Sequence, residues 1–218
     1  MPQSVAKFRT AALDVYRNAP LPTGRPAWVH ELSPNLYMND HRLHLTIAVM
    51  NLLSDEELTR AFGALDKARP AIVEAIGDQP LVAGLRGLRI MRGSHDECKV
   101  LYADVEDDAQ GRLRAVSKIL LTTFFAAGLL RNGDISRLKL HATLANVAFL
   151  SGTDLKAAGA HSDRGKSPRD QVFDAQPLLQ NMGNWDLGQA EIHRIQIARM
   201  GSVDPADGSY VSVHEIEV

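Results

Sequence analysis

The chain has 218 residues, 45% hydrophobic and 23% charged, which is enough to bury a core as one domain or two small lobes. A formal net charge of −2 argues against a surface that grips long nucleic acid mainly by charge, although a short phosphate-bearing ligand remains allowed. The single cysteine, Cys98, excludes an internal disulfide and a Cys-based zinc site. Without a long apolar run or a signal-peptide pattern, we expect a soluble intracellular protein with no membrane span.

The first quarter of the chain predicts a helix, irregular chain and a strand, in that order. Apolar residues at helical spacing indicate an amphipathic helix over 4–18. Four prolines make residues 19–34 extended or looping. Residues 44–53, HLTIAVMNLL, are β-branched and aliphatic, which predicts a strand that is buried on both faces at its end.

A helix start follows directly. Ser54 with Glu57 three positions later forms a capping box, in which each side chain accepts from the other residue's backbone N–H. The helix that it opens is predicted to run to about Ala68. Pro70 then predicts a separate short helical piece over 70–76.

The rest of the chain predicts antiparallel strands and fewer helices. A long helix is expected over 111–127, a short one at Leu178 and Leu179, and a flexible surface loop over 151–170. Strands are expected at 84–91, 98–106, 138–150, about 190–199 and about 209–217. Helices mixed with antiparallel strands, without regular βαβ alternation, predict an α+β fold.

Two short motifs of the same form are the sharpest chemical signal. His44-Leu45-Thr46-Ile47 and His141-Ala142-Thr143-Leu144 both read His, apolar, Thr, apolar. Chance gives about 0.3 of a His-x-Thr in a chain of this composition, so a matched pair is informative. On a strand, residues two apart share a face, so each motif presents one imidazole beside one hydroxyl.

That set of groups suits a phosphodiester. One neutral histidine can take a proton from a 2′-hydroxyl or a water, and the other can donate a proton to the leaving oxygen. The hydroxyls of Thr46 and Thr143 can bind the non-bridging oxygens. The arrangement requires neither a metal nor another cofactor. His41 and His44 stand three apart, but no third metal ligand is evident.

The paired motifs resemble those of the 2H phosphoesterase superfamily, which includes 2′,5′-RNA ligase-like proteins and cyclic phosphodiesterases. The stretch LRGLRIMRGSHDECKVLYADVED, the run RLKLHATLANVAF and the C-terminal tail are similar to the phosphoesterase-like domains of activating signal cointegrator complexes and of an A-kinase anchoring protein. The resemblance covers roughly 1–218, and the loop at 151–170 is the least alike.

The resemblance implies a single bilobed domain over 1–218, with two pseudo-symmetric lobes around a central cleft and one motif on each lobe. It implies that His44 and His141 are the proton-transfer pair and that Thr46 and Thr143 are the phosphate anchors. It further implies RNA or a nucleotide as ligand, subunits of a cointegrator-like complex as partners, and a nuclear or cytoplasmic location. Two features are not seen: the KH-type GXXG segment that the cointegrator proteins carry before this domain, and the strand that usually precedes the first helix in the family. Either that strand is missing from the sequence or one lobe is incomplete.

Other side chains admit more than one interpretation. Tyr102 and Phe149 could stack on a base, with Phe149 more simply a core residue. Cys98 fits a buried small hydrophobe. Three arginines could form either a phosphate-attracting rim or a solvated face: Arg86, Arg89 and Arg92.

Three functions follow from the sequence. The first is a metal-independent phosphodiesterase acting on RNA ends, cyclic phosphates or short oligonucleotides. The second is a non-catalytic nucleotide- or RNA-binding module of a transcription-coactivator or alkylation-repair complex. The third, a purely structural domain, gives no role to the two matched motifs.

Overall fold

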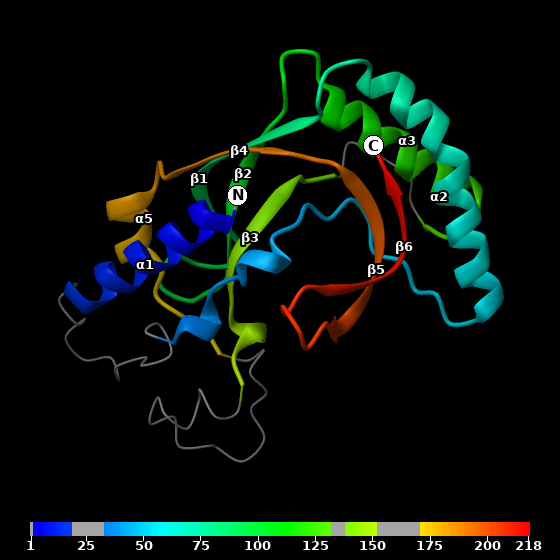
Figure 1. Ribbon diagram of the computed structural model, residues 1–218. Coiled ribbons are helices and arrows are strands. Elements are labelled where there is room, and N and C mark those ends of the chain that lie inside the picture. The colour runs from blue at the N-terminus through cyan, green and yellow to red at the C-terminus, as the bar shows by residue number, and fades with distance from the viewer. Residues whose placement is uncertain (1, 19–32, 132–137, 152–170) are drawn as a thin grey trace. The chain divides into compact units, whose positions relative to one another are not determined.

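The computed structural model describes residues 2–18, 33–131, 138–151 and 171–218, and the chain forms two compact units (Figure 1). Unit 1 consists of Met1–His44, Leu85–Asp104 and His141–Gly188. Unit 2 consists of Leu45–Gly84, Val105–Leu140 and Gln189–Val218. Helices and antiparallel strands occur in both, so the predicted α+β class is confirmed. None of the helices in the described ranges has the length and apolarity needed to cross a membrane.

The larger sheet has the strand order β3-β2-β1-β4. Its strands are β1 (Val82–Gly93), β2 (Cys98–Glu106), β3 (His141–Asn146) and β4 (Asp186–Glu191). β1 and β2 are joined by a turn, in which the Ser94 N–H donates to the Glu97 carbonyl at 3.2 Å. Gly93 has φ 98°, and a Cβ there would meet the Glu97 oxygen at 2.1 Å, so this turn requires glycine.

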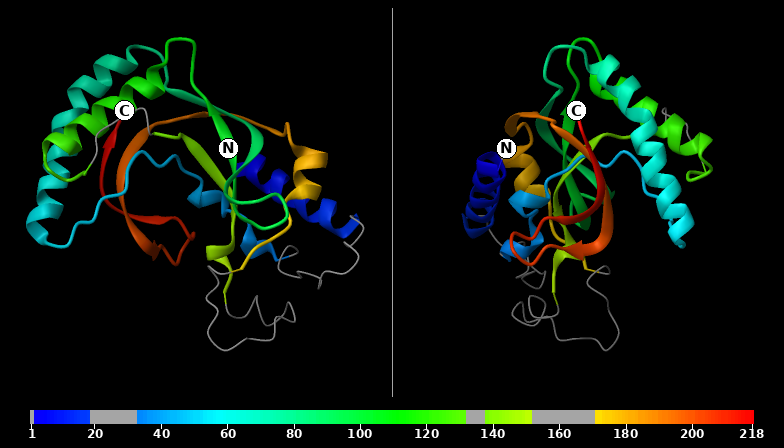
Figure 2. Two further views of the ribbon diagram at one scale, coloured as in Figure 1. Left: turned by 180° about the vertical axis from the view of Figure 1, so that it is seen from behind. Right: turned by 45° about the vertical axis from the view of Figure 1, so that its right-hand side comes forward.

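In unit 1, helices and short 3₁₀ turns surround the sheet residues. Helix α1 (Pro2–Asn18) packs with α5 (Gln176–Met182), as the views in Figure 2 also show. Phe8 is 1% exposed, and its ring lies edge-on to Tyr37 and to Trp185, with 6.3 Å between centroids in each case. The 3₁₀ turns are η2 (Pro34–Leu36), η3 (Asp40–Arg42) and η5 (Val147–Phe149).

In unit 2, two long helices pack with a two-stranded sheet. Helices α2 (Asp55–Ile76) and α3 (Arg112–Ala126) lie side by side (Figure 1). Strands β5 (Arg194–Val203) and β6 (Tyr210–Glu217) pair antiparallel, and Ile197 and Ile216 join the helices in one core. The capping box is confirmed: the Glu57 N–H donates to Ser54 Oγ, and the Glu57 carboxylate accepts from the Ser54 N–H, each at 3.2 Å.

The predicted break at Pro70 is wrong, because α2 continues through it to Ile76. A proline inside a helix removes one hydrogen bond and crowds the preceding turn. Beyond the proline, Ile72 and Ile76 are 0% and 8% exposed and enter the same core as Leu65. The free energy gained by burying these two side chains offsets the cost of the proline, so the helix continues through it.

The predicted strand over 44–53 is also wrong. Only Leu45 forms a bridge, and the remainder up to Leu53 has no regular structure. Leu45, Ile47, Met50 and Leu52 are only partly buried against the core of unit 2, while Val49 and Leu53 are 60% and 91% exposed. The aliphatic side chains of this segment pack against the core, but a strand also requires hydrogen bonds to a neighbouring backbone along its length.

Other elements differ less from the prediction. β2 has the predicted bounds, whereas β3 ends at Asn146, where the Asn146 side chain caps η5 by accepting from the Ala148 N–H. β4 was not predicted, because its residues are mostly exposed and polar rather than alternating. The looping stretch predicted over 19–34 falls almost entirely on residues 19–32, and the flexible loop predicted over 151–170 on residues 152–170. Both ranges lie outside the described residues.

Candidate functional site

The second motif lies on one face of β3, as the spacing predicts. Ala142 and Leu144 are fully buried, while His141 and Thr143 are partly exposed on the opposite face. In the antiparallel register with β2, His141 is opposite Asp104 and Thr143 is opposite Tyr102. Opposite residues of an antiparallel pair share a face, so these four side chains lie together.

Tyr102 supports the imidazole of His141. The two ring centroids are 5.8 Å apart and the rings stand at 82°, an edge-on contact. Tyr102 is only 2% exposed, so its ring is part of the packed interior beside the motif. The register between β2 and β3 shifts between Leu101 and Tyr102. The strand pairing is therefore irregular directly beside the contact between Tyr102 and His141.

Two of the three arginines of β1, Arg86 and Arg89, are paired with carboxylates. Arg89 Nε is 3.1 Å from Asp104 Oδ2, and Arg86 is paired with Asp186. All four side chains are more than two-fifths exposed. Each of these two guanidinium groups already has a carboxylate beside it, which favours the interpretation as a solvated face over that of a phosphate-attracting rim.

The first motif begins at the end of η3 rather than on a strand. Asn39 caps η3 by accepting from the His41 N–H at 2.8 Å, and Arg42 is its last residue. His44 Nδ1 lies 2.7 Å from the Arg42 carbonyl oxygen. A carbonyl can only accept, so Nδ1 carries the hydrogen and Nε2 of the neutral ring has the lone pair.

The environment of His44 favours its neutral form. Burial of the ring is the largest influence and holds its pKa below the ordinary value of 6.5. The hydrogen bond to the Arg42 carbonyl opposes this lowering of the pKa, and positive charge on His141 adds to it. The two histidines are therefore close enough to interact electrostatically.

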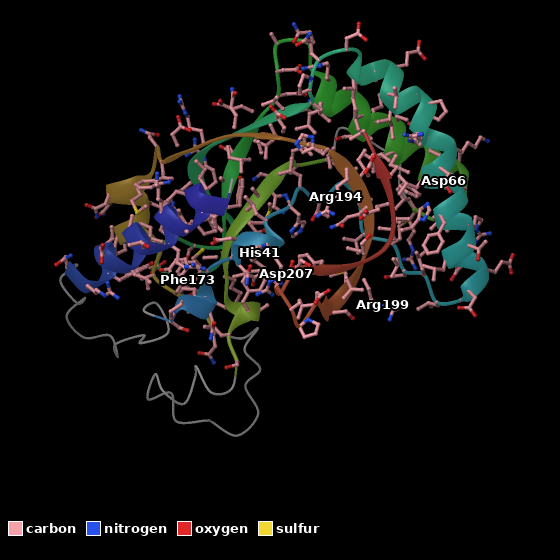
Figure 3. The ribbon with its side chains drawn as sticks, in the orientation of Figure 1. His41, Asp66, Phe173, Arg194, Arg199 and Asp207 are labelled. Atoms are coloured by element: carbon pink, nitrogen blue, oxygen red, sulfur yellow. The ribbon has the colours of Figure 1, made fainter. Side chains whose placement is uncertain are left out.

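The structure brings the two candidate histidines into one unit. His44 and His141 both belong to unit 1, whereas the remaining residues of the first motif, Leu45 to Ile47, belong to unit 2. Thr143 accompanies His141, while Thr46 follows the unit boundary and belongs to unit 2. His41 is exposed on η3 (Figure 3).

Two residues near the motifs were not singled out from the sequence. Asp104 could have been found, because it stands two residues from Tyr102 on a predicted strand and therefore shares its face. No sequence signal pointed to Arg42, because the residue that its guanidinium contacts, Phe149, is distant in the sequence.

The structure also bears on the metal site and the cysteine that the sequence analysis considered. Across the described ranges, no cluster of three or more His, Cys, Asp or Glu side chains is arranged to hold a metal ion. Cys98 is fully buried as expected. Burial raises the pKa of its thiol to about 12, despite an opposing hydrogen bond from the Val100 backbone.

Comparison with known proteins bears out the resemblance. The family model of the AKAP7 2'5' RNA ligase-like domain matches residues 4–218. Activating signal cointegrator 1 complex subunit 1 of Mus musculus is 28% identical over 189 residues, which are 84% of this chain and 52% of that protein. This chain thus spans about half the length of that relative.

Two further relatives are more distant. An uncharacterized protein of Schizosaccharomyces pombe is 23% identical over 168 residues, which cover 77% of this chain and 72% of that protein. The crystal structure of TT0787 of Thermus thermophilus is similar with a TM-score of 0.49 and 18% identity, covering 97% of this chain and 92% of the other.

Proposed function

Because the chain belongs to the AKAP7 2'5' RNA ligase-like domain family, we propose that it is a metal-independent phosphodiesterase acting on RNA ends, cyclic phosphates or short oligonucleotides. The observation that carries the proposal is the histidine pair of unit 1. His44 is held in a neutral, oriented form, and His141 is near enough to influence its pKa. A phosphodiesterase without a metal needs such a pair, one group to accept a proton and one to donate.

In the proposed reaction, His44 is the general base. Its Nδ1–H is bound to the Arg42 carbonyl, so Nε2 takes the proton from a 2′-hydroxyl or a water. The deprotonated oxygen forms a bond to phosphorus as the bond from phosphorus to the leaving oxygen breaks. His141 gives its proton to that leaving oxygen, and the two histidines end with their protonation states exchanged.

The neighbours of His141 have supporting roles in this proposal. Thr143 shares the face of His141 and donates a hydrogen bond to a non-bridging phosphate oxygen as charge develops there. Tyr102 orients the imidazole of His141 through the edge-on contact. Because the Tyr102 ring is buried, it can stack on a base of the ligand only if ligand binding exposes it.

Turnover by the purified full chain tests the proposal. The substrates are 2′,3′-cyclic nucleotides, 2′,5′-linked oligoadenylate and a short RNA, all with EDTA present. His44→Ala and His141→Ala should each lower kcat by several orders of magnitude, while His41→Ala, an exposed histidine three residues before His44, serves as the matched control. Full activity in the double mutant would refute the proposal.

A second candidate is a non-catalytic nucleotide- or RNA-binding module of a transcription-coactivator or alkylation-repair complex. The similarity to a subunit of the activating signal cointegrator 1 complex favours it, and such a role would place the protein in the nucleus or cytoplasm. Calorimetry with AMP distinguishes the two. Micromolar binding without turnover of any substrate supports the module, and turnover that the His44→Ala variant abolishes supports the enzyme.

A further inference from the structure

Arg42 and Phe149 form a contact in the unit that contains both histidines. Arg42 ends η3, two residues before His44, and Phe149 ends η5, which directly follows the strand that begins at His141. The guanidinium carbon of Arg42 is 5.6 Å from the centroid of the Phe149 ring. Phe149 is partly exposed, not the core residue that the sequence suggested. Stacking on the ring restricts where the guanidinium can lie.

No carboxylate within the described ranges forms an ion pair with Arg42. Three arginines are partly buried within the described ranges: Arg9, Arg42 and Arg112. Arg9 is paired with Asp40 at 3.8 Å, and Arg112 is paired with Asp108. Arg42 has no ion pair with any described residue, and its Nε is buried without a hydrogen-bond partner.

Burying a guanidinium N–H without an acceptor costs free energy, so we expect a bound ligand or a water to supply an acceptor. Asp40 is the nearest carboxylate in sequence, but it pairs with Arg9, and its own Oδ1 is also buried without a hydrogen-bond partner. A buried water could bridge these two atoms, which would make Arg42 a structural residue. An anionic ligand could equally supply the acceptor, and the two cases predict different behaviour of side-chain variants.

We propose that the Arg42 side chain binds a phosphate of the ligand, with Phe149 holding the plane of the guanidinium. The inference rests on the proposed function, which places a phosphate beside His44. Guanidinium matches phosphate because its N–H groups form a planar fork that can donate two parallel hydrogen bonds. The Arg42 backbone carbonyl meanwhile orients His44, and a side-chain substitution leaves that carbonyl in place.

The test uses the full chain with Arg42→Gln, Arg42→Lys and the matched control Arg17→Gln, which replaces an exposed arginine of α1. The Kd of AMP is measured by calorimetry, KM and kcat with a 2′,3′-cyclic nucleotide, and Tm without ligand. Arg42→Gln should raise the Kd of AMP and KM by about tenfold or more, since a charge-assisted hydrogen bond is lost. Arg42→Lys should recover part of the affinity, because it keeps the charge but not the fork. Arg17→Gln should leave Kd and KM unchanged.

Each outcome decides the inference. A lower Tm in Arg42→Gln with unchanged Kd and KM would assign the side chain to structure and overturn the inference, while leaving the proposed function intact. Equal effects of Arg42→Gln and Arg17→Gln would overturn it as well, because they would indicate general electrostatic attraction. A wild-type chain that neither binds AMP nor turns over any substrate would remove the proposed function and this inference together.

Discussion

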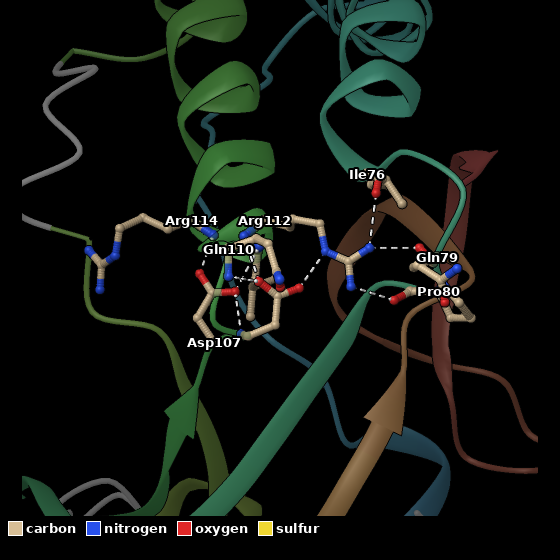
Figure 4. Close-up of polar contacts among 9 residues, drawn as sticks. Ile76, Gln79, Pro80, Asp107, Gln110, Arg112 and Arg114 are labelled. Carbon is tan, nitrogen blue, oxygen red and sulfur yellow. Dashed lines mark hydrogen bonds and ion pairs between the residues drawn. The ribbon is translucent and has the colours of Figure 1, made fainter.

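Arg112 joins the end of α2 to the start of α3, and its replacement should destabilise unit 2 (Figure 4). Its Nη1 donates to the carbonyls of Ile76 at 2.9 Å and Gln79 at 2.8 Å, and its Nη2 donates to Pro80 at 2.9 Å. Its Nε is paired with Asp108. The last carbonyls of a helix have no partner within the helix, so this guanidinium acts as a side-chain cap for α2.

The size of the effect follows from where the three carbonyls lie. The bond to Ile76 is partly buried, and a hydrogen bond from a charged donor contributes about 1.5–3 kcal/mol. The bonds to Gln79 and Pro80 are exposed, so water replaces the guanidinium there at about 0.5 kcal/mol each. Arg112→Met keeps most of the stem but removes these three bonds and the Asp108 ion pair, and the three bonds alone give a loss of about 2.5–4 kcal/mol. For a chain of this size, that loss lowers Tm by roughly 5–15 °C.

Urea unfolding followed by far-UV circular dichroism measures this loss, because α2 and α3 are helices of unit 2. Arg114→Met is the matched control, since Arg114 lies two residues along the same helix and its side chain points away from the three carbonyls (Figure 4). Arg112→Lys should lose less than Arg112→Met, because an ammonium still reaches some of the carbonyls. An Arg112→Met variant as stable as Arg114→Met, within about 0.5 kcal/mol, would refute the capping argument.

Four further predictions concern His44, Cys98 and Ser54. The low pKa of His44 should place the acidic limb of the kcat/KM profile below pH 6.5; a midpoint above that value would contradict His44 as the base. The same group affects stability: the unfolded imidazole takes up a proton first as pH falls through 6.5, so the free energy of unfolding should decrease there, and less steeply in His44→Asn. Cys98, buried with a pKa of about 12, should react with a thiol reagent only on unfolding; rapid labelling of the native chain would show that it opens locally. Ser54→Ala should cost about 1 kcal/mol in urea unfolding and Ser54→Asp much less, since aspartate also caps; equal losses would argue against the cap.

The parts of the fold that were predicted correctly are those specified by neighbouring residues. The start of α2 depends on Ser54 and Glu57, three positions apart, and β2 depends on a short run of strand-forming residues between turns. The same locality holds for the second motif, since His141 and Thr143 share a face whenever their segment is extended.

The parts that failed depend on residues far away in sequence. Whether residues 44–53 form a strand is decided by the backbone beside them, which the segment itself does not encode. Whether Pro70 ends a helix is decided by the core that Ile72 and Ile76 enter. Arg42 belongs to the same class, because its importance comes from Phe149 and from the absence of an ion pair to any described carboxylate.

The two motifs have the same form in sequence but different surroundings in the structure, and the proposed reaction needs that difference. One histidine must begin without its proton and the other with it, so two imidazoles in equal environments would compete for the same proton. His44 stands at the end of a 3₁₀ turn, where a backbone carbonyl fixes its Nδ1–H and burial lowers its pKa. His141 stands at the start of a strand, beside the ring of Tyr102 and opposite Asp104. We infer that the irregular backbone of the first motif is part of the chemistry, because it gives His44 an environment that a second matching strand would not provide.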